Sequence, residues 1–178
     1  SYVNELAHYI MQDLKEFRKI QGDDTLGGMV ICETSEQARR LYDVFQEEWQ
    51  KYQPKPIKIK LPDGTFVVGE PEVDYKSKYR PLKAGIILHD TDDKETRKQT
   101  VKDFKKNMTV DILIVFNMLL TGFDAPRLKR LYFGRKLKDH NLLQAITRVN
   151  RPYPGMRYGF VIDFADIKRN FKETNEAY

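Results

Sequence analysis

The chain has 178 residues, 40% of them hydrophobic and 32% charged, which is typical of a globular domain and excludes disordered and fibrous proteins. No run approaches the roughly 20 apolar residues of a membrane span. Cys32 is the single cysteine and cannot form an internal disulfide, so we expect it to be a core residue of a protein in a reducing cytoplasm. A net charge of +5 permits a nucleic-acid partner, while three histidines without a Cys/His cluster argue against a zinc site.

The first predicted element is a helix over residues 2–20, whose apolar residues recur at helical spacing before a turn-rich break. We expect residues 1–24 to form a connector helix that packs on the side of the following domain. Residues 28–32 then predict a strand, and Thr34 or Ser35 is suited to cap the next helix. A helix start of this kind suits phosphate binding, although plain capping explains both side chains equally well.

Residues 51–83 depart from this strand-and-helix pattern and predict an inserted β-hairpin. Residues 57–61 and 65–68 alternate between apolar and polar side chains, and Pro-Asp-Gly at 62–64 supplies a turn between them. The lysines and tyrosines of the insertion allow a surface that faces DNA or another subunit. A solvated excursion with no partner is the alternative.

The remaining chain alternates further strands with helices. Apolar runs of strand length occupy residues 84–88, 112–116, 131–134 and 160–164. A helix over 92–106 directs Val101, Phe104 and Met108 inward, and His89 is either structural or close to a site. Buried strands that alternate with helices predict a three-layer α/β/α fold with a mainly parallel sheet.

Residues 117–126 follow the buried strand 112–116, which we expect to end at the sheet edge where α/β proteins bind ligands. Thr121 offers a hydroxyl and Gly122 lets the backbone approach a phosphate closely. Asp124 can accept a hydrogen bond from a ribose hydroxyl or orient an arginine. A structural turn closed by the following proline is the alternative.

The helix that begins near Asp139 and stops at Pro152 has two different faces. Spacing of four and three residues places Gln144, Arg148 and Arg151 on one stripe. The opposite stripe is apolar and consists of Leu142, Ile146 and Val149. Because guanidinium groups match phosphate oxygens bidentately, the polar stripe suits phosphate recognition, with a solvated basic face as the alternative.

The two segments together resemble motifs V and VI of superfamily 2 helicases. The forms Met-Leu-Leu-Thr-Gly-Phe-Asp-Ala-Pro (118–126) and Gln-Ala-Ile-Thr-Arg-Val-Asn-Arg-Pro-Tyr (144–153) are most similar to the motor (R) subunit of type I restriction-modification enzymes. Thr147 and Asn150 stand where many helicases have glycine, which favours the restriction branch. The resemblance implies that residues 25–165 form the second RecA-like motor domain and that residues 166–178 begin a following helical segment.

The resemblance also implies a set of ligands and partners. ATP with Mg²⁺ would bind jointly with a first motor domain, Arg148 and Arg151 would be catalytic, and one of them would be the arginine finger. The implied nucleotide-binding residues are Asp124, Gly122 and Gln144, and the implied DNA-backbone contacts are Thr121, Thr34 and Ser35. The expected partners are double-stranded DNA and the methylation and specificity subunits, without a membrane and in a prokaryotic cytoplasm.

Two components of a complete enzyme do not occur in this sequence. It contains neither a Gly-x-x-x-x-Gly-Lys-Ser/Thr phosphate loop with its acidic box nor a recognisable nuclease cluster. We therefore expect activity only within a larger ATP-dependent deoxyribonuclease. Alternatives are another superfamily 2 motor, such as a type III restriction subunit or a remodeller-like translocase, and a non-catalytic α/β module that binds acidic protein.

Overall fold

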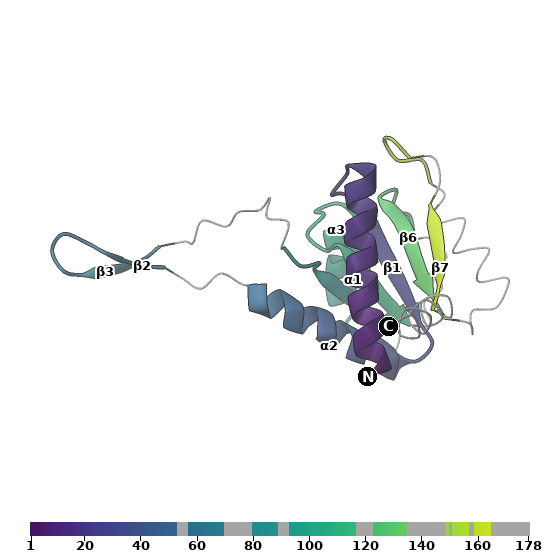
Figure 1. The fold of residues 1–178 in the computed structure, drawn as a ribbon, viewed down its shortest axis with the longest axis horizontal. Helices are drawn as coiled ribbons and strands as arrows, with labels where there is room; N and C mark the ends of the chain where they lie inside the picture. Colours follow the sequence, from purple (N-terminus) through teal and green to yellow (C-terminus); the bar gives the residue numbers. More distant parts are fainter. Residues whose placement is uncertain are drawn as a thin grey trace, which may run out of the picture.

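The computed structural model describes residues 1–52, 57–69, 80–88, 93–116, 123–134, 149, 151–156 and 159–164. A five-stranded parallel sheet in the order β4-β5-β1-β6-β7 forms the centre of the molecule (Figure 1). Its strands are β1 (Gly27–Cys32), β4 (Ala84–Leu88), β5 (Ile112–Phe116), β6 (Leu128–Phe133) and β7 (Phe160–Asp163). The helices within the described ranges are α1 (Tyr2–Gln21), α2 (Ser35–Tyr52) and α3 (Lys94–Lys105).

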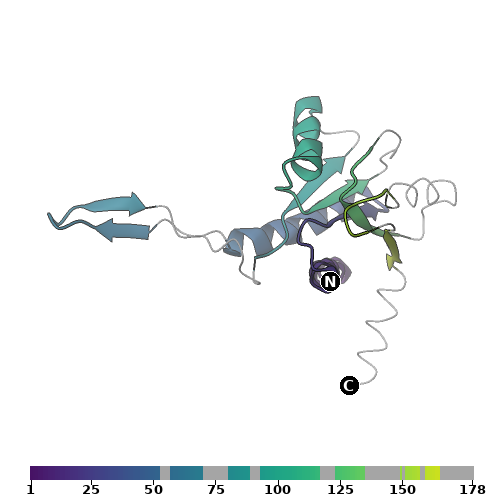
Figure 2. The same ribbon diagram turned by 90° about the horizontal axis from the view of Figure 1, so that it is seen from above.

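Helices cover both faces of the sheet and produce the predicted three layers. Helices α1 and α2 pack on one face, where Leu14 and Phe45 join the buried side chain of Val30. Helix α3 lies on the opposite face, where Phe104 packs against Met29 (Figure 2). Because successive residues of a strand point to opposite faces, the neighbours Met29 and Val30 of β1 supply one side chain to each core.

The helix predicted over residues 2–20 is present and is fixed firmly to the sheet. Asp13 on α1 accepts hydrogen bonds from Arg130 Nε at 2.8 Å and from the Tyr132 hydroxyl at 2.6 Å, both on β6. Gly22 ends the helix in the left-handed region, with φ of 67°. These contacts make α1 part of the core layer of the molecule.

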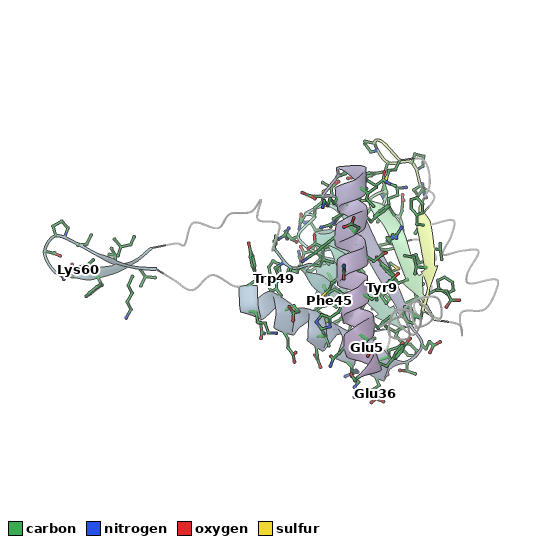
Figure 3. The ribbon with its side chains drawn as sticks, viewed as in Figure 1. Glu5, Tyr9, Glu36, Phe45, Trp49 and Lys60 are labelled. Atoms are coloured by element: carbon green, nitrogen blue, oxygen red, sulfur yellow. The ribbon has the colours of Figure 1, made fainter. Side chains whose placement is uncertain are left out.

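The predicted hairpin is confirmed and forms a separate antiparallel sheet of β2 (Ile57–Lys60) and β3 (Phe66–Gly69). Asp63 accepts hydrogen bonds from the backbone N–H and hydroxyl of Thr65 at 2.9 and 2.6 Å, and so closes the turn. Figure 3 shows Lys60 on this hairpin, which stands apart from the five-stranded sheet. The apolar side chains exposed on it are Ile59, Leu61, Phe66, Val67 and Val68.

Two predicted details differ from the structure. Phe104 is fully buried as expected, but the inward position of Met108 is wrong, because α3 ends at Lys105. Met108 lies beyond the helix with φ of 55° and is 41% exposed. Strand β6 begins at Leu128, three residues before the predicted start at 131, because buried charged side chains interrupt its apolar pattern.

Cys32 lies at the end of β1 and is buried, as predicted for a core residue. Burial, with a smaller contribution from the charge of Glu33, raises the pKa of its thiol to about 12. A thiol with this pKa is not a nucleophile near neutral pH. Across the described residues, the helices are too short or too polar to cross a bilayer.

Candidate nucleotide and nucleic-acid site

The strand order creates a switch point beside β1, where open α/β sheets bind ligands. Strand β1 pairs with β5 on one side and β6 on the other, so the chain must cross β1 between these two strands. Thr34 and Ser35 follow β1 at the carboxyl edge of the sheet. Thr121 and Gly122 follow the neighbouring strand β5 and lie outside the described residues.

The start of α2 confirms the predicted cap. The backbone N–H of Gln37 donates to Thr34 Oγ1 at 3.0 Å, and Gln37 Oε1 accepts from the backbone N–H of Glu33 at 2.9 Å. Figure 3 labels Glu36 in the first turn, where its negative charge is favourable at the helix N-terminus. Capping therefore accounts for the Thr34 hydroxyl, and contact of Thr34 or Ser35 with a nucleic-acid backbone stays a prediction.

Asp124 and Arg151 come from the two motif segments and lie side by side. Asp124 Oδ1 is 3.4 Å from Arg151 Nε, and their side chains are 41% and 46% exposed. Oδ1 itself is covered and accepts no hydrogen bond from the described residues. Because an exposed pair contributes only about 0–1 kcal/mol to stability, this pair adds little to the stability of the fold.

The pair lies on the α3 face of the sheet, toward the amino ends of the strands. The ring of Phe123 is 6.4 Å from that of Phe104 near the end of α3. Tyr153 directly follows the segment that carries Arg148 and Arg151, which we call the arginine segment. Its hydroxyl lies 2.7 Å from that of Thr25, which precedes β1. Strand β5 ends at the carboxyl edge as predicted, but the chain must return to the amino edge to begin the parallel strand β6. Asp124 lies on this return path.

Val149 anchors the arginine segment in the core on the α3 face, as predicted. It is fully buried in the same cluster as Phe123 and Leu131. A Cβ added to Gly159 would lie 2.7 Å from the carbonyl carbon of Val149 and would overlap its oxygen, so only glycine allows this close approach. The other predicted members of the helix, Leu142, Gln144, Ile146 and Arg148, lie outside the described residues.

Sequence analysis did not identify Lys129, which contacts the same segment. Its side chain is completely buried on β6, and its amine donates to the carbonyl oxygens of Val149, at 3.1 Å, and Arg151. Burial lowers the pKa of this amine. The sequence signal was weak, because a lysine within a short strand predicts an exposed position.

A second buried cation, Arg127, serves the fold rather than the site. Its guanidinium donates to the carbonyl oxygens of Thr25, Phe104 and Val110 at 2.7–2.8 Å. Burial, and next the positive charge of Arg18, lower its pKa to about 10. All three acceptors lie at the amino edge, where Arg127 joins the end of α3 to the segments that enter β1 and β5.

Comparison with known proteins identifies the family. A family described as T1R_D3-like, type I restriction enzyme subunit R domain 3, matches residues 73–166, more than half of the chain. The chain belongs to this family of R subunits. A protein of Methanocaldococcus jannaschii named as the endonuclease subunit of type I restriction enzyme MjaVIIIP is 32% identical over 180 residues, covering 97% of the chain and 16% of that protein.

A second relative matches a shorter part of the R-subunit domain. The SauCOLORF180P endonuclease subunit of a Staphylococcus aureus type I restriction enzyme is 41% identical over 80 residues, covering 44% of the chain and 8% of that protein. The chain therefore spans only a small part of the length of these relatives.

Solved structures identify the fold of this R-subunit domain. Domain 2 of the DEAD-box helicase Mss116p, bound to an RNA duplex, superimposes with a TM-score of 0.55 at 15% identity, covering 92% of the chain and 50% of that structure. The C-terminal part of the Fun30 ATPase domain gives 0.53 at 11% identity, covering 89% and 43%. The predicted RecA-like fold is thus confirmed.

Proposed function

We propose that this chain is the second motor domain of an ATP-dependent, DNA-translocating R subunit in a prokaryotic cytoplasm. The pairing of Asp124 with Arg151 carries the proposal, because it brings an acid and a guanidinium from two separate motifs to one accessible place. The R-subunit family of the chain supports it. The complete protein would be a type I site-specific deoxyribonuclease.

The residues present fit ATP with Mg²⁺ held against a first motor domain. The Asp124 carboxylate is partly exposed and has acceptor capacity for a ribose hydroxyl, and the half-exposed Arg151 can turn donors toward phosphate oxygens. Arg148 would reach the phosphates beside Arg151, and Gly122 and Gln144 would line the nucleotide. ATP hydrolysis would supply the free energy that closes and opens the two domains.

DNA would follow the carboxyl edge of the sheet. The α2 start at Thr34 and Ser35 adjoins β1 at this edge, and Thr121 follows the neighbouring strand β5 in the sequence. Hydroxyls and helix N-terminal N–H groups hold phosphates without reading sequence. Sequence recognition would therefore belong to the specificity subunit, with the methylation subunit as the other partner.

We expect the chain by itself to bind duplex DNA weakly, without sequence preference, and to hydrolyse no ATP. Backbone contacts release counterions, so the logarithm of the binding constant should fall linearly with the logarithm of the salt concentration. Titration of two unrelated duplexes over a salt series, with ATP turnover measured in the same samples, checks this. A preference for one duplex, the absence of a salt slope, or ATP turnover would contradict the expectation.

Asp124→Ala in the complete subunit tests the nucleotide site. If Asp124 orients Arg151, DNA-stimulated ATP hydrolysis should fall by roughly 10²-fold, the cost of a small misplacement of a catalytic group. If it holds the ribose instead, the wild type should prefer ATP over 2′-deoxy-ATP and the variant should not. Asp93→Ala is the control, because Asp93 is exposed and its side chain makes no capping bond. Unchanged hydrolysis and unchanged nucleotide preference would remove Asp124 from the site.

A further inference from the structure

Lys129 occupies an irregular position in β6. The pairing of β6 with β1 joins Gly27 to Leu128 and Gly28 to Arg130, so Lys129 is the extra residue of a β-bulge. A bulge re-aims the side chain of its extra residue. Here the side chain points into the α3 face and reaches the arginine segment, whereas the next residue, Arg130, points to the opposite face and Asp13.

The contacts of Lys129 hold the backbone at the end of the predicted arginine helix. Its Nζ donates to two backbone carbonyls, those of Val149 and Arg151, and within the described ranges no carboxylate lies within ion-pair distance of it. The last carbonyls of a helix lack partners within the helix and carry its partial negative charge, which a cation offsets. Burial of an ammonium is costly, so a hydrophobic residue would be expected here if packing were the only requirement.

One short segment therefore holds Arg151 at two points. Asp124, which leads into β6, contacts the guanidinium, while Lys129 on the same strand holds the backbone carbonyl. The backbone of Gly159 packs against Val149 from another side. The position of the guanidinium relative to β6 is consequently set by the bulge as well as by the exposed ion pair.

We propose that Lys129 is a positioning residue for Arg151, which holds the backbone of this arginine so that its guanidinium reaches the nucleotide phosphates. The inference rests on the proposed function of the site. It assigns a role in ATP hydrolysis to a side chain that touches no nucleotide and lies in the core. The bulge lets Leu128 and Lys129 both point to the α3 face, whereas consecutive residues of a regular strand would alternate between the two faces.

Lys129→Met in the complete subunit is the principal test. Methionine approximates the aliphatic part of the lysine side chain and removes both hydrogen bonds. We expect kcat for DNA-stimulated ATP hydrolysis to fall by roughly 10²-fold with KM nearly unchanged, since about 1 Å of displacement has that cost. Lys129→Gln retains an amide donor, should lose less activity, and serves as the variant of choice if the methionine protein does not fold.

Two comparisons separate positioning from stability. Tyr132→Phe removes a buried hydroxyl bond of 2.6 Å on the same strand but on the opposite face, so it should lower the melting temperature and leave kcat unchanged. In an Arg151→Ala background, Lys129→Met or Lys129→Gln should cause no further loss of kcat. An additive loss, or a normal kcat in a destabilised Lys129 variant, would overturn the inference. A normal kcat for Arg151→Ala would overturn the inference alone, whereas the proposed function is overturned only if Arg148→Ala is normal as well.

Discussion

Arg151→Ala in the complete subunit is expected to reduce DNA-stimulated ATP hydrolysis by about 10³–10⁵-fold, the contribution of an arginine finger. Arg148→Ala should have an effect of this size if the finger is Arg148, and the comparison of the two variants identifies it. Arg→Lys should rescue little, because a compact ammonium cannot reproduce the planar fork of donors. Steady-state hydrolysis with saturating DNA measures all four variants.

The same Arg151 variant should leave the folding of the chain almost unchanged. The side chain is half exposed, its described contact is the 3.4 Å pair with Asp124, and the anchor Val149 is untouched. Lys98→Ala is a matched control, because Lys98 is an exposed cation with a 4.0 Å partner, Glu95, on α3. Near-normal hydrolysis in both arginine variants would mean that the polar stripe is a solvated face.

The sequence predicted those parts of the fold that depend on local pattern. Strands β1 and β5 are continuous apolar runs, and a parallel sheet buried on both faces requires such runs. The cap at Thr34 and the turn at Asp63 depend on side chains that bond to nearby backbone, so their partners were visible in the sequence. Val149 was predictable because the period of a helix places it opposite the arginines.

Buried charges were not predictable, because their partners are distant in the sequence. The charged residues Lys129 and Arg130 interrupt the apolar pattern at the start of β6, so the sequence predicted a later start. Only the folded chain shows that Lys129 contacts Val149 and that Arg130 contacts Asp13. Asp124 lies at the amino edge because the chain returns to this edge before it begins β6. Only the strand order of the folded sheet reveals this return. Asp111 directly precedes the apolar run of residues 112–116, and nothing in the sequence indicates that its carboxylate is buried and bonded to distant segments.

Asp111, just before β5, contacts α1 and the segment before β4 through its buried carboxylate, and β1 through its backbone carbonyl. Oδ1 accepts from Arg18 of α1 at 3.0 Å, and Oδ2 accepts from the backbone N–H of Lys83 before β4 at 2.7 Å. Arg80 lies 3.6 Å from Oδ2, and the backbone carbonyl of Asp111 accepts from Gly28 of β1 at 3.1 Å. The Asp111 side chain is 3% exposed and that of Arg18 is 8% exposed, so solvent cannot replace either partner.

Asp111→Ala is therefore expected to destabilise the chain by about 3–5 kcal/mol, because it leaves the Arg18 charge buried without a partner. That is a large share of a typical unfolding free energy of roughly 5–15 kcal/mol. Chemical denaturation of the chain measures it, and Asp93→Ala, which removes an exposed acid that makes no capping bond at the start of α3, should change the unfolding free energy by less than about 1 kcal/mol. Combining Asp111→Ala with Arg18→Met should recover part of the loss, since no buried charge then lacks its partner. A loss no larger than that of the Asp93 control would show that water or a neighbouring carbonyl accommodates Arg18, and that the amino edge does not depend on this ion pair.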